Sequence, residues 1–189
     1  MSIFEYMATI VAIVLGLAAA NFLNKFSKTV IIIDWKPLGW FFSLWCLILL
    51  ICLLGAFWSF WRVYNGVDEI SIWEFILVPF FTVVCFFLSS VFLPIPEEEN
   101  LKANAGLDFI EARKPFFVTL TVQWSHFTLI PLLIDFKQSS LEIVFGCLMI
   151  ILSFSGIFLI TLRAHKLLLT AWCITFLSQE AVQFAIGTI

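Results

Sequence analysis

Long apolar stretches alternate with short polar connections along almost the whole chain. Six stretches are long enough to cross a bilayer, which takes roughly 20 apolar residues per helix. They cover residues 3–22, 38–61, 72–93, 116–134, 141–162 and 167–186. The sixth is the weakest, because Ser178-Gln179-Glu180 interrupts it. The pattern predicts an all-α fold, a transmembrane helix bundle of about six spans that forms a single domain over residues 1–189.

Composition agrees with this pattern and limits the partners. Hydrophobic residues make up 62% of the chain and charged residues 12%, against about 25% charged in soluble domains. The mean hydropathy is +1.09. A net charge of −3 without a basic cluster argues against direct binding of nucleic acid. The lipid bilayer is therefore the first expected partner.

The first stretch carries small residues at every fourth position. The row consists of Ala8, Ala12, Gly16 and Ala20, and Asn24 continues it. Residues four apart share one face of a helix, and small side chains let two helices approach closely in lipid. We interpret this row, called the small-residue strip below, as a helix-packing face, and we expect a homo-oligomer.

The distribution of Lys and Arg predicts the orientation. Eight of the ten bases fall in the first, third and fifth connections, and the second and fourth hold only Arg62 and Lys137. The eight are Lys25, Lys28, Lys36, Lys102, Arg113, Lys114, Arg163 and Lys166. Connections rich in bases stay in the cytoplasm. Both termini are therefore expected outside, in a multi-pass membrane protein.

The cytoplasmic connection over residues 94–115 is the longest. Its apolar residues are spaced unevenly among charged ones, a pattern that indicates a short interfacial helix. It is either a solvated connector or a docking surface for a cytosolic protein. The candidate docking residues are Asp108, Phe109, Glu111, Arg113 and Lys114.

Two polar stripes fall at membrane depth, where each polar group needs a partner or water. One consists of Thr119, Gln123 and His126 in the fourth stretch, the other of Thr175, Gln179, Glu180 and Gln183 in the sixth. We expect the two to meet. They act either as hydrogen bonds that hold helices together or as the lining of a wet path for ions, with His126 and Glu180 as its titratable members.

Signals for chemistry are otherwise sparse. The acids Glu5 and Glu74 lie near the expected outer boundary, where they reach the surface or pair with Arg62. His165 falls in the fifth connection, far from His126, so a shared metal is not expected. The five cysteines all lie in apolar runs without metal-ligand spacing. We predict no catalytic residue, no metal and no cofactor, and so no enzyme.

Three segments carry a resemblance to a family. They are Phe4-Glu5-Tyr6 with Ile13-Val14-Leu15-Gly16-Leu17, Asp108-Phe109 with Arg113-Lys114-Pro115-Phe116-Phe117, and Leu162-Arg163 with His165. Together they resemble a recurring group of small bacterial inner-membrane proteins. The resemblance implies a polytopic fold in the inner membrane, and the group has no established activity. A more distant similarity is to the membrane subunit of the Kiwa antiphage defence system. It implies a cytosolic partner subunit and a role in antiviral defence.

Two classes of function follow. The first is an oligomeric membrane scaffold or sensor that relays to a cytosolic protein. The second is a small ion channel or transporter that uses the two polar stripes. An intramembrane enzyme is a remote third reading. A dry contact between the stripes favours the scaffold, and a water-filled path past His126 favours the channel.

The orientation predicts the behaviour of a reporter at the C-terminus. A fluorescent protein that matures only in the cytoplasm should stay dark when fused after Ile189, because both termini are expected outside. Fluorescence of intact cells measures this, with the same reporter inserted after Asn100 as the bright control. A bright C-terminal fusion would mean that the sixth stretch does not cross or that the orientation is inverted.

Overall fold

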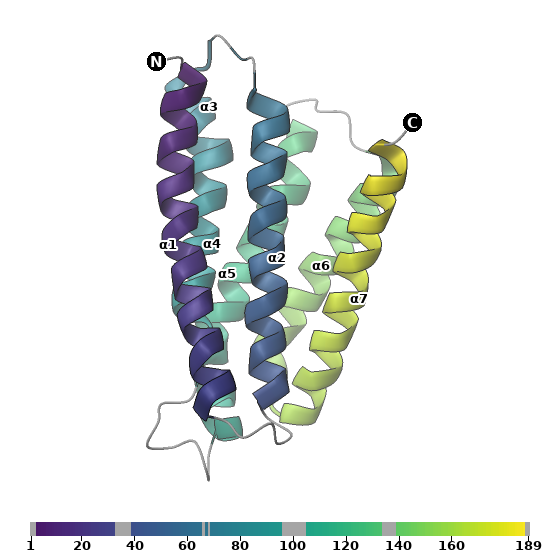
Figure 1. The fold of residues 1–189 in the computed structure, drawn as a ribbon. Coiled ribbons are helices and arrows are strands. Elements are labelled where there is room, and N and C mark those ends of the chain that lie inside the picture. Colours follow the sequence, from purple (N-terminus) through teal and green to yellow (C-terminus); the bar gives the residue numbers. More distant parts are fainter. Residues whose placement is uncertain are drawn as a thin grey trace. The chain divides into compact units, whose positions relative to one another are not determined.

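Every regular element that the structure describes is a helix. The computed structural model describes residues 3–32, 39–65, 67, 69–95, 105–133 and 139–187, without the side chains of residues 31, 32, 105, 131, 133 and 183–187. The helices are α1 (Ile3–Ile32), α2 (Gly39–Tyr64), α3 (Ile72–Phe75), the π-helical η1 (Ile76–Phe80), α4 (Phe81–Phe92), α5 (Ala105–Leu133), α6 (Ser140–Phe158) and α7 (Leu162–Gly187) (Figure 1). The expected all-α class is confirmed.

Four of these helical segments are long and apolar enough to span a membrane. They are Ile3–Val30, Gly39–Tyr64, Ile72–Phe92 and Ser140–Phe158. The first, second, third and fifth predicted spans correspond to them. α5 and α7 occupy the places of the fourth and sixth predicted spans but are not among the four, so a count of six spans stays a prediction.

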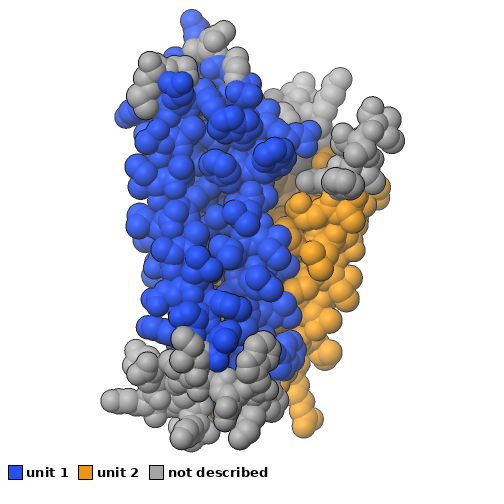
Figure 2. Space-filling model, viewed as in Figure 1, with its two compact units in different colours: residues 1–98 blue, residues 99–189 orange. Residues whose placement is uncertain are grey.

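The chain forms two compact units, which Figure 2 shows in different colours. Unit 1 covers Met1–Glu98 and unit 2 covers Glu99–Ile189. In unit 1, α1 packs against both α2 and α4. In unit 2, α6 packs against both α5 and α7. The chain thus contains two helical groups, each with its own interior, and the single domain expected from the sequence stays a prediction.

In unit 1, α1 packs through large side chains rather than through the small-residue strip. Its buried residues alternate in steps of three and four, which keeps them on one face of the helix. They are Phe4, Met7, Val11, Leu15, Ala18, Phe22 and Thr29. The Phe4 ring stacks on Phe60 at a centroid distance of 5.9 Å. α1 is therefore anchored to α2 by aromatic packing.

The small-residue strip lies beside this face. Ala12, Gly16 and Ala20 are exposed and Ala8 is half-buried. A Cβ atom added at Gly16 would meet nothing within 4 Å. The strip is not what holds α1 within unit 1, because the neighbouring face buries more surface. Its role as a packing face for contacts beyond unit 1 stays a prediction.

Close approach of helices occurs instead in unit 2, along α6. Its buried residues Gly146, Met149, Ser153 and Gly156 share one face. A Cβ atom at Gly156 would lie 2.6 Å from Cγ of Phe117, and one at Gly146 would lie 2.9 Å from Cγ2 of Thr128. Both neighbours belong to α5. The two glycines thus leave room for side chains of α5, and a larger residue at either position would occupy that room.

Two local sequence features shape individual helices. Ser139 and Glu142 form a capping box at the start of α6: the Ser139 amide donates to Glu142 Oε2 at 2.7 Å, and the Glu142 amide donates to Ser139 Oγ at 3.2 Å. Pro79 lies inside η1. Because proline has no amide hydrogen, the α-helical ladder cannot continue through it, and the helix widens into a π turn instead of ending.

The packing of α6 predicts a contrast between two glycine substitutions. Gly156→Ala should lower the free energy of unfolding by about 1–3 kcal/mol, because the new methyl group overlaps the rigid ring of Phe117. Gly16→Ala adds the same methyl group to an exposed helix position and should leave stability unchanged or raise it slightly. Thermal unfolding in detergent, followed by circular dichroism, measures both. Equal melting temperatures for Gly156→Ala and the parent would contradict this packing.

Candidate functional site

The predicted polar stripe of α5 lies largely inside unit 2. Thr119 and Gln123 are buried, and His126 is half-buried beside the ring of Phe127. The Thr119 hydroxyl donates to the carbonyl of Pro115 in its own helix, at 2.9 Å. A threonine that bonds to its own backbone is satisfied without another helix.

The predicted stripe of α7 behaves in the same way. The Thr175 hydroxyl donates to the Ala171 carbonyl at 2.9 Å. Gln179 and Glu180 are half-buried, and Gln179 Oε1 is a buried atom without a hydrogen-bond partner among the described residues. The side chain of Gln183 lies outside the described residues. The threonines of both stripes therefore do not provide the expected bridge between the two helices.

Aromatic side chains form the contact between α5 and α7. Trp124 of α5 meets Trp172 edge to face at 5.9 Å and Phe176 at 6.4 Å. The Trp172 indole also donates to Ser153 Oγ of α6 at 3.2 Å. We call the six rings involved the aromatic seam: Phe109, Phe117 and Trp124 of α5, and His165, Trp172 and Phe176 of α7. Large rings here keep the two backbones apart.

His165 is the polar member of the aromatic seam. It lies in the first turns of α7, not in a connection as expected, and it is fully buried. Its ring stacks on Phe117 at 5.3 Å and meets Phe109 edge to face at 5.1 Å. Nε2 lies 3.0 Å from the Leu159 carbonyl. Since a carbonyl can only accept, Nε2 carries the hydrogen.

Arg113 lies between the two phenylalanines that contact His165. Positions 109, 113 and 117 share one ridge of α5, because they are four residues apart, and Arg113 acts electrostatically on His165. Arg113 is only 7% exposed. Its Nη1 donates to the Ile110 carbonyl, and its Nε is buried without a partner among the described residues. A cation and an imidazole are thus both buried in this part of unit 2.

The five candidate docking residues separate into two groups. Glu111 and Lys114 are exposed and Asp108 is half-buried, whereas Phe109 and Arg113 face the interior of unit 2. The cause is that residues 105–115 belong to α5, so the helical period sorts the residues by face. The regular spacing of Phe109, Arg113 and Phe117 was the signal for this. Residues 96–104 of the same connection lie outside the described residues.

Unit 1 has a polar cluster where α1 passes the end of α4. Lys25 Nζ donates to the carbonyls of Val91 at 2.8 Å and Leu93 at 2.6 Å. One turn away, Asn21 Nδ2 donates to Ser90 Oγ at 3.2 Å. A lysine suits this place because the carbonyls at a helix C-terminus are unpaired and carry partial negative charge. The sequence had placed Lys25 in a connection, since α1 was expected to end at residue 22.

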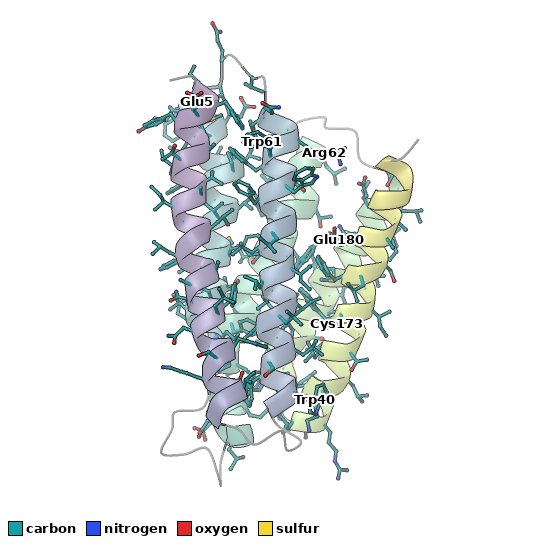
Figure 3. All side chains as sticks on the ribbon, viewed as in Figure 1. Glu5, Trp40, Trp61, Arg62, Cys173 and Glu180 are labelled. Carbon is teal, nitrogen blue, oxygen red and sulfur yellow. The ribbon has the colours of Figure 1, made fainter. Side chains whose placement is uncertain are left out.

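The opposite end of unit 1 holds the predicted outer acids. Glu5 and Glu74 are exposed. The Glu74 amide donates to Ser71 Oγ at 3.1 Å, which caps α3. In Figure 3, Glu5, Trp61 and Arg62 lie at one end of unit 1 and Trp40 at the other. Tryptophan at both ends of a helical unit is typical of membrane interfaces.

The described residues contain no group of three or more His, Cys, Asp and Glu that could hold a metal. The five cysteines, all within the described residues, form no disulfide: Cys46, Cys52 and Cys85 are buried, Cys173 is half-buried and Cys147 is exposed.

Long apolar helices with tryptophan at their ends define the class, a helical membrane protein. Comparison of the chain with protein-family models, curated proteins and solved structures finds no match.

The lysine at the end of α4 generates a stability prediction. Lys25→Met keeps the length of the side chain but leaves the Val91 and Leu93 carbonyls without their donor. The free energy of unfolding should fall by about 1–3 kcal/mol. Lys28→Met is the matched control, because Lys28 is exposed on the same helix. Thermal unfolding of both variants measures the difference, and equal losses would contradict the bonded role of Lys25.

Proposed function

We propose that this protein is a non-catalytic scaffold or sensor subunit of the bacterial inner membrane. It assembles into a homo-oligomer through α1 and relays to a cytosolic protein. The inner-membrane setting draws on the resemblance to small bacterial membrane proteins, and antiviral defence as its context draws on the distant similarity to the Kiwa membrane subunit.

The observation that carries this proposal is the exposure of the small-residue strip. Ala12, Gly16 and Ala20 face outward from unit 1 while large side chains of α1 fill its interior. A flat surface of this kind gains little contact with lipid tails, but it permits close packing against another helix. A second copy of the chain offers the same surface, which is the usual basis of symmetric assembly.

The cytosolic partner is assigned to the first turns of α5. Glu111 and Lys114 are exposed there, with Asp108 half-buried beside them. By the distribution of Lys and Arg this end lies in the cytoplasm. Charges of both signs on one helical surface favour a protein partner whose charges complement them.

The alternative, an ion channel or transporter, draws on the half-buried His126, Gln179 and Glu180. Against it stands the aromatic seam, because stacked and edge-to-face rings fill the contact between α5 and α7. Ion flux into liposomes between pH 5 and 8 decides between the two functions. A pH-dependent flux that disappears in His126→Ala and Glu180→Gln, at unchanged melting temperature, would overturn the scaffold proposal.

Assembly through α1 predicts the effect of a larger residue in the strip. Gly16→Leu should dissociate the oligomer without unfolding unit 1, because an added side chain there has open space within the unit. Gly55→Leu is the control: a Cβ at Gly55 of α2 also meets nothing within 4 Å, but it lies outside the strip. Native mass spectrometry in detergent gives the stoichiometry. An unchanged oligomer in Gly16→Leu, or equal dissociation in both variants, would contradict the proposal.

A further inference from the structure

Three buried nitrogen atoms of unit 2 lack hydrogen-bond partners among the described residues: Arg113 Nε, His165 Nδ1 and Trp124 Nε1. The first two belong to one part of the unit. The Phe109 and Phe117 rings contact His165 from one turn before and one turn after Arg113. Groups buried in this way are normally bonded, because an unmade hydrogen bond in an apolar interior is costly. The pair therefore points to a ligand that provides what both atoms need.

The need of Arg113 is a negative charge. Its guanidinium is always protonated, yet the side chain is only 7% exposed. Within the described part of the chain its one hydrogen bond goes to a neutral carbonyl, that of Ile110, and no carboxylate pairs with it. A buried charge is stable when it is paired and hydrogen-bonded. Planar donors of arginine match the oxygens of phosphate with two parallel bonds.

The need of His165 is a hydrogen-bond donor. Nε2 donates its hydrogen to the Leu159 carbonyl, so in the neutral imidazole Nδ1 has a free lone pair that can only accept. The Phe109 and Phe117 rings hold the imidazole in place. A hydroxyl group beside the phosphate would satisfy Nδ1 and fix the orientation of the ligand.

We propose that Arg113 and His165 form a binding site for a phosphate that carries a hydroxyl group. Phosphate oxygens accept from the Arg113 guanidinium, and the hydroxyl donates to His165 Nδ1. This site goes beyond the proposed scaffold role and does not depend on it.

Two sources supply this chemistry. One is a lipid headgroup such as phosphatidylglycerol, whose glycerol hydroxyls lie next to the phosphate, because basic sites between helices at the cytoplasmic side hold anionic headgroups. The other is soluble hydrogen phosphate, which carries its own hydroxyl. The same residues would hold either, so binding experiments need one arm for each.

The test uses the purified full chain after removal of lipid. Native mass spectrometry measures retention of phosphatidylglycerol, with phosphatidylcholine and phosphatidylmethanol, which lacks a headgroup hydroxyl, as comparison lipids. Thermal unfolding measures stabilisation by inorganic phosphate. Stronger retention of phosphatidylglycerol than of both comparison lipids supports the site with a lipid ligand. Stabilisation by inorganic phosphate without lipid preference supports it with the soluble ligand. A response to neither overturns it.

Variants separate the site from general attraction by surface charge. Arg113→Gln should weaken binding about tenfold, as loss of a charge-assisted hydrogen bond does, while Arg113→Lys should keep part of it. Lys114→Gln removes the same charge from an exposed neighbour and should change binding less than about twofold. Equal losses in Arg113→Gln and Lys114→Gln would overturn the site.

A final comparison tests whether carboxylates outside the described residues pair with Arg113. Without ligand, Arg113→Gln should melt no lower than the parent, because it removes an unpaired buried charge. A lower melting temperature, reproduced by Glu97→Gln, Glu98→Gln and Glu99→Gln combined, would show that Arg113 is already paired within the chain and would overturn the proposal.

Discussion

The hydrocarbon of a bilayer offers no water to polar groups, so each must be bonded within the protein. Unit 1 follows this constraint where α4 ends, because Lys25 reaches across from α1 to the Val91 and Leu93 carbonyls. Unit 2 follows it where Thr119 and Thr175 bond to their own helices. The helix ends and the orientation of most polar side chains result from this need for internal partners.

Contact area between helices is the second determinant of how the helices pack. Lipid tails are as apolar as leucine, so burial alone does not draw helices together. Unit 2 gains this contact by pairing small with large. Gly156 receives the ring of Phe117 and Gly146 receives Thr128, which brings α5 against α6. Across α5 and α7 the aromatic seam fills the wider gap, and rings in stacked and edge-to-face arrangements add attraction beyond their area.

Arg113 and His165 depart from the rule that each polar group is bonded within the protein, as Trp124 and Gln179 also do within the described residues. Both are buried, each uses one nitrogen in a bond to a backbone carbonyl, and each keeps another nitrogen without a partner among the described residues. A buried polar group without a partner requires an explanation, and a bound ligand is one. The scaffold proposal and the phosphate site thus concern different parts of the molecule, the outer face of α1 in unit 1 and the interior of unit 2.

The pattern of hydrophobic positions determined the helical class and the approximate place of each long helix, because the apolar length of a span is a local property. The same holds for the capping box of Ser139 and Glu142, whose residues are three apart. Only the tertiary structure decided which faces pack. Gly16 and Gly156 are both glycines in apolar helices, yet only Gly156 receives a neighbouring ring. Likewise, Phe109 and Phe117 meet His165 across α5 and α7, because contacts distant in sequence depend on the relative rotation of two helices, which no local pattern specifies.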